Sequence, residues 1–443
     1  MLSEFDLTTS DGRAGFERLL ERLGETVSMT GDAAEAVAAI VAEVRADGDE
    51  AVVRHMQRWT DPEFSVDRIA VTGAELASAE AKLDPCLREA IEAAIANVRA
   101  YQEHIKPADP GPIELAGAEL GLRFTPVDSA GLCVPGGTAV LFSTLIMLAV
   151  PALVAGVPAD RISVIHPPPT RREGEPGRDI SPIVLATAHM LGLSRVYRIG
   201  GAQAVAALAY GTQRVEPVSM IAGPGNVFVQ LAKAFVAGRV GTEGGFYGPS
   251  EIVTIADASA SPQRVAADLI AQAEHDPGKC FLVTWQRRVL EAILGQVDVQ
   301  LQQRARREAI ERALTEESAA VLVADEAEAV EVANRIACEH VSLAVQDPDK
   351  LLGRLRHGGE VFLGDATPVA AGDYYAGPSH CLPTGRTARF ASGVSAYTFL
   401  KRTGTVAYRG GMPAAAVDHV ARMAEAEGLD AHALSARLRG EGG

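Results

Sequence analysis

From Gly131 to Leu363 the sequence alternates between short apolar segments and segments with helical periodicity. Strands are predicted at Gly131–Val134, Arg161–Ile165, Arg195–Ile199, Ser219–Ile221, Glu251–Ile255, Phe281–Thr284, Ala320–Val323, Ser342–Val345 and Val361–Leu363. Helices are predicted between them, for example at Ala202–Tyr210, Val227–Val240, Pro262–His275 and Glu326–Ile336. This alternation is typical of parallel sheets buried on both faces. It predicts an α/β protein with two doubly wound groups, one ending near Gly241 and one beginning near Ser250.

The two ends of the chain are predicted to be helical. Residues 13–107 have mainly helical spacing, with a break at Asp47-Gly48-Asp49. After about Phe390 no further strand is predicted, and the tail carries helices near Met412–Glu425 and Ala431–Arg439. At 443 residues the chain is long enough for several domains.

Composition restricts the partners and the compartment. The net charge of −16, from 41 basic and 57 acidic residues, disfavours non-specific binding to nucleic acid or anionic membranes. The five cysteines form no Cys-x-x-Cys pair and the N-terminus lacks a secretion signal, which fits a cytoplasmic protein. The apolar run from Ala139 to Val157 contains Ser143, Thr144 and Pro151. A buried helix therefore explains it better than a membrane span, which needs about 20 apolar residues.

Gln272 and His275 belong to the most informative segment, Gln272-Ala-Glu-His275-Asp-Pro-Gly-Lys279. They stand three residues apart at the end of a predicted helix, and residues at that spacing share a helix face. They can supply half of a four-ligand metal site, and Asp373 and His432 in later segments can supply the rest. Ordinary roles stay open for the same residues: a helix C-cap for His275, a turn for Asp373 and a surface position for His432.

Glu339 and His340 are candidates for proton transfer. They follow a predicted helix and precede a predicted strand, and such connections at one edge of a doubly wound sheet line the ligand crevice. A carboxylate and an imidazole can both move protons near neutral pH. Neighbours on an extended backbone point apart, so the two are expected to serve different protons. Taken in isolation, the pair is better explained by a solvated glutamate and a capping histidine.

Three glycine-rich turns each follow a predicted strand and open a predicted helix. They are Val134-Pro-Gly-Gly-Thr138, Ile199-Gly-Gly-Ala-Gln203 and Ile221-Ala-Gly-Pro-Gly-Asn226. Backbone N–H groups in such turns suit a phosphate or another anion, whereas any single turn is also explained by tight strand-to-helix geometry. No intact Gly-x-Gly-x-x-Gly and no P-loop lysine is present. A nucleotide crevice here would differ from the usual dinucleotide mode.

Two Gly-Pro turns present a short polar group, Tyr247-Gly-Pro-Ser-Glu251 and Ala376-Gly-Pro-Ser-His380. Ser250 has no neighbouring base in the sequence and no Gly-x-Ser-x-Gly elbow, which disfavours a nucleophile. Hydrogen bonding to a substrate is the better functional interpretation, and a plain turn is the alternative.

Taken together, these segments resemble the histidinol dehydrogenase family. The resemblance covers nearly the whole chain and is strongest from Gly131 onward. It rests on the ordered segments Gly131-Leu-Cys-Val-Pro-Gly-Gly137, Gly200-Gly-Ala-Gln-Ala204, Ala222-Gly-Pro-Gly-Asn226, Gly248-Pro-Ser-Glu251, Gln272-Ala-Glu-His-Asp-Pro277, Glu339-His340, Gly372-Asp-Tyr374, His380-Cys-Leu-Pro-Thr-Gly385, Ala388-Arg-Phe390 and Glu427-Gly-Leu-Asp-Ala-His432.

The resemblance implies an intertwined homodimer with shared active sites and two incomplete Rossmann-like domains in each subunit. It implies an N-terminal helical segment over residues 1–30 and a first domain, on the zinc and substrate side, over residues 31–130 and 246–390. The second domain, on the NAD side, is expected over residues 131–245. A helical tail over residues 391–443 is expected to reach the other subunit.

The resemblance also implies the site residues. One zinc ion per subunit is expected on Gln272, His275, Asp373 and, from the other subunit, His432. Glu339 and His340 are expected to form the acid–base pair. Substrate contacts are expected at Ser250, Gln272, His275, His340, Asp373, His380, Glu427 and His432. NAD+ contacts are expected at Cys133, Gln203 and Asn226.

Four positions depart from the family pattern. Tyr is usual where Cys133 stands, Pro where Cys338 stands, Ala where Tyr247 stands and Asn where Ser379 stands. The Cys133 change bears on NAD binding, and the Cys338 change lies directly before the acid–base pair. None of the four removes an expected metal ligand or proton carrier.

The implied reaction is the oxidation of L-histidinol to L-histidine through L-histidinal, with reduction of two NAD+, as the last step of histidine biosynthesis. A first alternative is a related zinc- and NAD-dependent dehydrogenase for another small alcohol, such as a sulfonated diol. A zinc hydrolase with Glu339 as base is disfavoured because the sequence lacks a His-Glu-x-x-His helix. A non-catalytic binding protein would have lost ligands that are all present here.

Overall fold

The computed structural model describes residues 2–24, 28–136, 140–171, 179–275 and 278–440. Some residues of the segments discussed in the sequence analysis lie outside the described residues. They are Gly137, Thr138, Ala139, Asp276 and Pro277. The chain divides into two compact units. The first comprises Met1–His104 and Asp128–Phe399, and the second comprises Ile105–Val127 and Leu400–Gly443.

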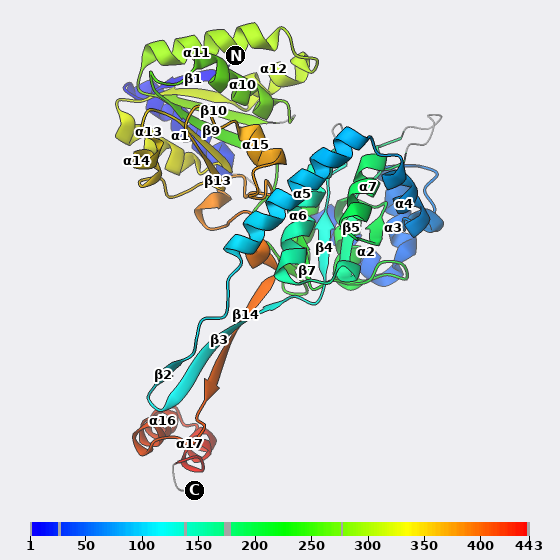
Figure 1. Cartoon of the computed structure of the whole chain (residues 1–443), viewed down its shortest axis with the longest axis vertical. Helices are drawn as coiled ribbons and strands as arrows, with labels where there is room; N and C mark the ends of the chain where they lie inside the picture. The colour runs from blue at the N-terminus through cyan, green and yellow to red at the C-terminus, as the bar shows by residue number, and fades with distance from the viewer. Residues whose placement is uncertain (1, 25–27, 137–139, 172–178, 276–277, 441–443) are drawn as a thin grey trace. The chain divides into compact units, whose positions relative to one another are not determined.

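The first unit contains a six-stranded parallel sheet with the strand order β1-β11-β10-β9-β12-β13 (Figure 1). Its strands are β1 (Ser3–Asp6), β9 (Glu251–Ala256), β10 (Lys279–Thr284), β11 (Ala319–Leu322), β12 (His340–Ala344) and β13 (Glu360–Leu363). Successive residues face opposite sides of a sheet, so Ile252 joins one core and Val253 the other. The first core includes residues of α10 (Pro262–Ala273), α11 (Arg287–Leu301) and α12 (Arg307–Glu316), and the second includes residues of α1 (Ser10–Gly24), α13 (Glu326–Ile336) and α14 (Pro348–Leu352).

The N-terminal end of the chain begins with a strand, whereas the sequence predicted a helical segment over residues 1–30. β1 pairs in parallel with β11, and Ser3 lies opposite Ala319. Leu2 and Leu7 flank the strand and are buried in the two different cores. Four residues are too few to show the strand period, so only the helix α1 that follows was recognisable.

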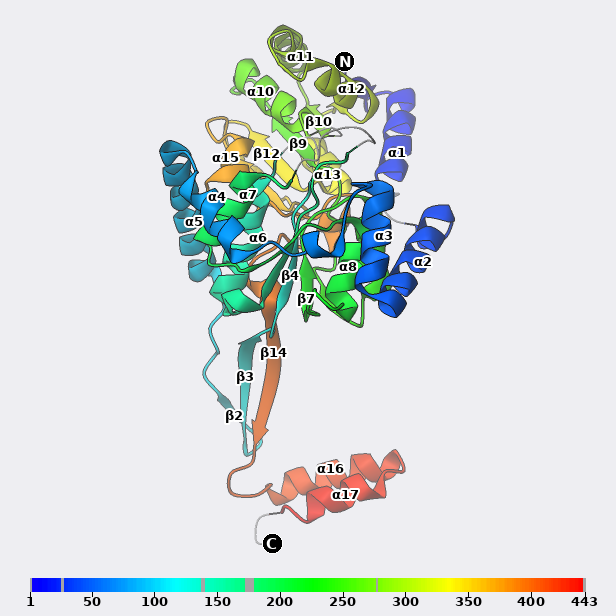
Figure 2. The same ribbon diagram turned by 90° about the vertical axis from the view of Figure 1, so that its right-hand side faces the viewer.

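A second parallel sheet in the same unit has the order β6-β5-β4-β7-β8. Its neighbouring strands β4 and β7 are labelled in Figure 2. Its strands are β4 (Ala130–Cys133), β5 (Ile162–Ile165), β6 (Arg195–Tyr197), β7 (Met220–Ala222) and β8 (Gly241–Thr242). The helices that follow its strands are α6 (Phe142–Ala155), α7 (Pro182–Met190), α8 (Gly201–Tyr210) and α9 (Val227–Val236). Almost every residue of α6 is buried, as predicted for this apolar run. Across the described parts of the chain, every helix is too short or too polar to cross a membrane.

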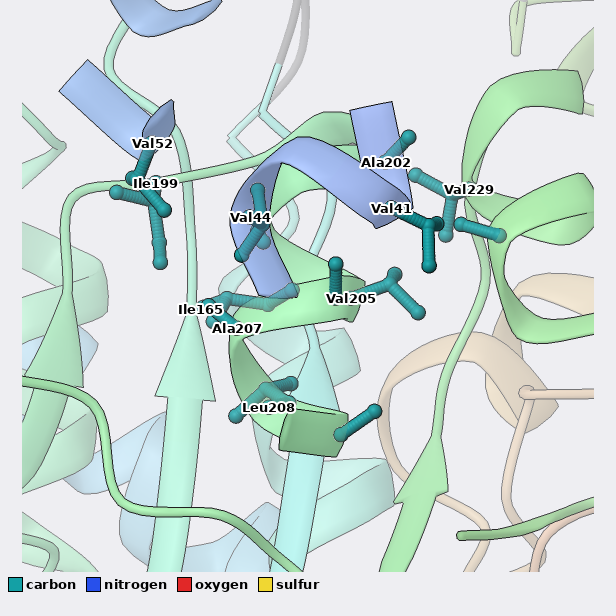
Figure 3. Packing of buried hydrophobic residues seen from close by; sticks show 14 of the residues in the cluster. Val41, Val44, Val52, Ile165, Ile199, Ala202, Val205, Ala207, Leu208 and Val229 are labelled. Carbon is teal, nitrogen blue, oxygen red and sulfur yellow. The ribbon is translucent and has the colours of Figure 1, made fainter. Parts of the chain in front are cut away.

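Helices α2 (Asp32–Asp47) and α3 (Asp49–Trp59) pack with the five-stranded sheet, whereas we expected residues 31–130 to accompany the six-stranded sheet. Val44 of α2 shares one core with Val205 of α8 (Figure 3). Periodicity shows which face of a helix is buried but not which sheet covers that face. The break between these two helices lies at Gly48, as predicted, and the helix α5 (Pro85–Ile105) lies within the region of helical spacing, residues 13–107.

Two predicted helices end early. α9 ends at Val236 rather than at Val240, and α10 ends at Ala273 rather than at His275. His275 therefore lies just beyond its helix, and its N–H donates to the Gln272 carbonyl at 3.3 Å. This bond keeps the two residues one turn apart.

The second unit contains an antiparallel sheet with the order β14-β3-β2, which the sequence did not predict. β14 (Leu400–Ala407) pairs with β3 (Ala118–Pro126) along its whole length, and β2 (Ile113–Leu115) extends the sheet (Figure 1). We expected no strand after about Phe390, because the β14 sequence Leu-Lys-Arg-Thr-Gly-Thr-Val-Ala shows no apolar alternation. Its residues are mostly exposed, so little burial is available to impose that alternation.

The tail of the second unit forms two helices, α16 (Ala414–Ala426) and α17 (Asp430–Arg437). They lie side by side, with a small shared core of Ala421, Ala424 and Ala433 (Figure 2). Both helices begin within two residues of the positions that the sequence predicted.

Candidate active site

A cavity of about 400 Å³ lies in the first unit. The five-stranded sheet reaches it through the carboxyl ends of its strands, where α/β sheets usually bind ligands. The six-stranded sheet reaches it through the segments before β9 and β12, which are the amino ends of these strands. The cavity thus joins glycine-rich turns of one sheet to acid–base candidates of the other. Among the residues that line it are Cys133, Thr144, Gly200, Gly201, Asn226, Ser250, His275, Glu339, His340, Asp373, Tyr374 and His380.

Glu339 is a buried carboxyl group with two hydrogen-bond donors. Its Oε1 accepts a hydrogen bond from the Ser250 hydroxyl and one of 2.8 Å from the Glu251 N–H. Burial raises the pKa of Glu339 well above its usual range, and the two hydrogen bonds act in the opposite direction because they stabilise the carboxylate. Burial thus favours the protonated form and the hydrogen bonds favour the carboxylate, and a carboxyl group in such a site can serve as a proton carrier.

His340 is the first residue of β12 and is almost completely buried. Burial lowers its pKa to about 4, so the imidazole is neutral at physiological pH. Among the described residues, neither ring nitrogen has a hydrogen-bond partner. The Nδ1 atom lies 3.7 Å from Glu339 Oε1, which is longer than a hydrogen bond, so no direct bond joins the two side chains. His340 can therefore act as a proton acceptor separately from Glu339.

His380 is fixed by partners on both ring nitrogens. Nδ1 lies 2.8 Å from the Asp373 carbonyl oxygen, which can only accept, so Nδ1 carries the proton. Nε2 is then an acceptor, and the Thr144 hydroxyl donates to it over 3.0 Å. Burial lowers the pKa of His380, and the Asp373 charge opposes this shift. Thr144 on α6 thus ties the five-stranded sheet to the loop that carries His380.

Two of the four expected metal ligands line the cavity. His275 follows α10, and Asp373 lies in the last turn of α15 (Val369–Tyr374). Gln272 lies in the last turn of α10, where its side chain is buried and its Nε2 has no partner in the described residues. Within the described part of the chain, no group of three or more His, Cys, Asp or Glu is arranged to hold a metal ion.

The fourth expected ligand, His432, belongs to the second unit. It lies in α17 and is exposed, and Glu427 is the exposed C-cap residue of α16. Both residues are absent from the described lining of the cavity, which comes entirely from the first unit.

The expected NAD contacts divide into two groups. Cys133, at the end of β4, and Asn226 line the cavity. Burial raises the pKa of the Cys133 thiol to about 11, so the thiol stays protonated. Asn226 caps α9 because its Oδ1 accepts from the N–H groups of Phe228 at 3.1 Å and Val229 at 3.2 Å. Gln203 is buried inside α8 with its Nε2 3.5 Å from Met56 Sδ, and it is not part of the described lining.

Sequence reasoning missed two polar residues near the cavity. Thr144 was noticed only as a polar interruption of an apolar run, which is the signal that could have identified it. Glu360 begins β13 beside His340, and burial followed by the Asp373 charge raises its pKa to about 7. No sequence pattern marked Glu360, because its position follows from strand pairing.

Comparison with known proteins agrees with the resemblance seen in the sequence. A family model described as histidinol dehydrogenase matches residues 25–440. A histidinol dehydrogenase of Cereibacter sphaeroides is 43% identical over 430 residues, 96% of each chain, and one of Synechococcus sp. is 41% identical over 435 residues, 97% of each chain. The crystal structure of histidinol dehydrogenase from Elizabethkingia anophelis has a TM-score of 0.88 at 30% identity and covers 99% of this chain and 98% of that one. The chain therefore belongs to the histidinol dehydrogenase family.

Proposed function

We propose that this chain oxidises L-histidinol to L-histidine through L-histidinal and reduces two NAD+ in doing so. The observation that carries the proposal is the single cavity lined by the glycine-rich turns after β6 and β7 and by Glu339 and His340. Membership of the histidinol dehydrogenase family supports the same reaction. The cavity volume of about 400 Å³ is within the range of small-molecule sites.

The residues around the cavity fit the two cofactors that the reaction needs. Backbone N–H groups at the start of α8, which no side chain of its N-cap residue Gly200 caps, suit the pyrophosphate of NAD+. Gln272, His275 and Asp373 offer the oxygen and nitrogen donors that zinc accepts, and the amide nitrogen of Gln272 is buried without a partner in the described residues. NAD+ would accept the hydride in each oxidation, while zinc would orient the substrate.

In the proposed mechanism, His340 and Glu339 take different protons. His340 is neutral and accepts the proton of the substrate alcohol as the carbinol carbon is oxidised. Glu339 accepts a proton from the water that adds to the aldehyde, and the Ser250 and Glu251 hydrogen bonds stabilise its carboxylate. The carbonyl oxygen takes the proton back from His340 as the diol forms, and the neutral His340 then accepts the proton of the diol as the diol carbon is oxidised. Each acceptor of this kind typically contributes about 10²- to 10⁴-fold to the rate.

We further propose a homodimer in which His432 of the partner subunit completes the zinc site and Glu427 of the partner subunit contacts the substrate. The second unit supports this, since it has a small core and exposes large apolar side chains such as Met423 at 67% and Leu438 at 70%. Apolar surface of this kind usually marks a protein interface, and an extended terminal segment suits exchange between subunits.

We also propose that the two parallel sheets mark two Rossmann-like domains and that the protein works in the cytoplasm. The five-stranded sheet would serve NAD+, and the six-stranded sheet would serve zinc and substrate. All five cysteines are free, and four of them are buried, which supports a reducing compartment.

The test is a measurement of NADH formed when histidinol is added to the purified protein with NAD+ and zinc. We expect two NADH per histidinol consumed and much slower turnover of short-chain alcohols and sulfonated diols. Absence of NADH with histidinol, together with turnover of another alcohol, would overturn the proposal in favour of a related dehydrogenase.

A further inference from the structure

The inward side of α9 carries two buried polar residues that have no role in the site described above. Gln230 and Lys233 stand three residues apart, so they project from the same helix face, and they are 5% and 4% exposed. Neither lines the cavity in the described part of the chain. Burying an ammonium group is costly unless its partners are well placed, so the contacts of Lys233 need an explanation.

Lys233 and Glu243 hold the peptide groups of Gly223 on both sides. The Lys233 ammonium donates to the Gly223 carbonyl and to Glu243 Oε1, and the same Oε1 accepts the Gly223 N–H at 3.0 Å. The side chains of Lys233 and Glu243 are 5% and 2% exposed. A Cβ at Gly223 would lie 2.4 Å from the Cys133 carbonyl oxygen, so the turn is fixed against β4. The next residues, Pro224 to Asn226, line the cavity.

Gln230 holds the segment that leads to Ser250. Its Nε2 donates to the Tyr247 carbonyl at 3.0 Å, and its Oε1 accepts the Tyr247 N–H at 3.3 Å. The Gly225 N–H also donates to the Tyr247 carbonyl, at 3.1 Å. The Lys233 ammonium lies 5.7 Å from the centroid of the Tyr247 ring, within the range of a cation–π contact. Gln230 and Lys233 of α9 therefore contact both the turn that begins at Gly223 and the segment that leads to Ser250.

We propose that Gln230, Lys233 and Glu243 are positioning residues that fix the distance between the turn Gly223–Asn226 and the Ser250–Glu339 pair across the cavity. The inference rests on the proposed function, because it assigns NAD+ binding to the turn Gly223–Asn226 and proton transfer to the Ser250–Glu339 pair. Hydride transfer requires reacting atoms about 3–3.5 Å apart, and a displacement of about 1 Å can cost about 100-fold in rate. A rigid connection between the turn Gly223–Asn226 and the Ser250–Glu339 pair would keep the reacting atoms at this distance.

The test compares Lys233→Met with Gln230→Leu. Lys233→Met frees the Gly223 turn, so we expect the Kd and KM for NAD+ to rise by about tenfold or more while the KM for histidinol changes little. Gln230→Leu frees the Tyr247 segment, so we expect kcat to fall by about tenfold or more with a smaller change in NAD+ affinity. If the two residues had a purely structural role, both variants would have a lower melting temperature. NAD+ affinity would then not be lost specifically in Lys233→Met, nor kcat specifically in Gln230→Leu.

Two further variants keep the comparison interpretable. Lys233→Met leaves Glu243 buried without its cation, and Lys233→Met/Glu243→Gln removes both charges, so the double variant carries the test if the single variant does not fold. Arg198→Met is the matched control, because Arg198 is also 4% exposed and ion-paired, to Asp179 and Glu75, yet lies outside the cavity lining. We expect it to lower the melting temperature but to leave NAD+ affinity within about twofold.

Direct titration of NAD+ by calorimetry separates this inference from the proposed function. If the parent protein binds NAD+ but does not oxidise histidinol, the proposed function fails and the Kd comparison still tests the positioning role. The inference would be overturned if Lys233→Met and Gln230→Leu had the same Kd for NAD+ and the same kinetic constants as the parent protein. It would also be overturned if Arg198→Met lost as much NAD+ affinity as Lys233→Met.

Discussion

Burial shifts the pKa values of Glu339 and His340 in opposite directions because it disfavours the charged form of each. The carboxyl group then keeps its proton to higher pH, whereas the imidazole stays free of a proton to lower pH. Neighbouring titratable groups whose pKa values are pushed apart are a common sign of acid–base function. The Ser250 hydroxyl and the Glu251 N–H donate to Glu339, so the two residues differ in their hydrogen bonds as well as in the direction of their pKa shifts.

Glu339→Gln is expected to separate the two oxidation steps. The amide keeps an oxygen that can accept from Ser250 and Glu251 but cannot take a proton from water. Oxidation of added histidinal should therefore fall by about 10²- to 10⁴-fold, while the first hydride transfer from histidinol should fall much less. Single-turnover measurements with each substrate give the two rates. Equal losses in both steps would contradict the role of Glu339 in water activation.

His340 makes stability depend on pH. Its pKa is about 4 in the folded protein against an ordinary 6.5, so between these values the unfolded chain binds more protons. The free energy of unfolding therefore falls as the pH drops from 6.5 towards 4, by roughly 3 kcal/mol in total at about 1.4 kcal/mol per pKa unit. His340→Asn removes this contribution. The free energy of unfolding of the metal-free variant should therefore fall less on acidification than that of the metal-free parent protein. Urea unfolding at neutral pH and near pH 4.5 measures the difference. Parallel losses would show that the imidazole is not buried in its neutral form.

At the scale of elements, burial on both faces decided which strands could be predicted. β4, β9, β10 and β12 are buried along their length, and their continuous apolar sequences identified them. β14 is mostly exposed and carries no such signal, so the antiparallel sheet of the second unit was missed.

The candidate site shows the same limit. Family motifs indicated Ser250, His275 and Asp373, which line one cavity, but neither the motifs nor the periodicity indicated that Thr144 contacts His380. Gln203 shows that a motif residue can lie behind the residues that line the cavity, since its side chain contacts Met56 of α3. Contacts between distant segments depend on how helices pack, and a single sequence does not encode that packing in a local pattern.

At the scale of the whole molecule, the residues proposed for the site belong to different units of the chain. The cavity lining comes from the first unit, whereas His432 and Glu427 lie on the helices of the second. Those helices expose large apolar side chains such as Met423 and share only a small core of alanines. The homodimer proposed above, in which two copies exchange their second units, would bury this apolar surface and would bring the proposed zinc ligand His432 to the cavity of the other copy.

Mixing two inactive variants tests this shared site most directly. His340→Ala removes the proposed proton acceptor but keeps the C-terminal helices, and His432→Asn removes the proposed zinc ligand but keeps the cavity. In a heterodimer with exchanged second units, the cavity of the His432→Asn subunit receives an intact His432 from its partner. After unfolding and joint refolding of equal amounts, histidinol-dependent NADH formation should return to about a quarter of the parental rate, since half of the dimers each regain one of two sites. Activity that stays at the level of the separate variants would contradict a site built from two subunits.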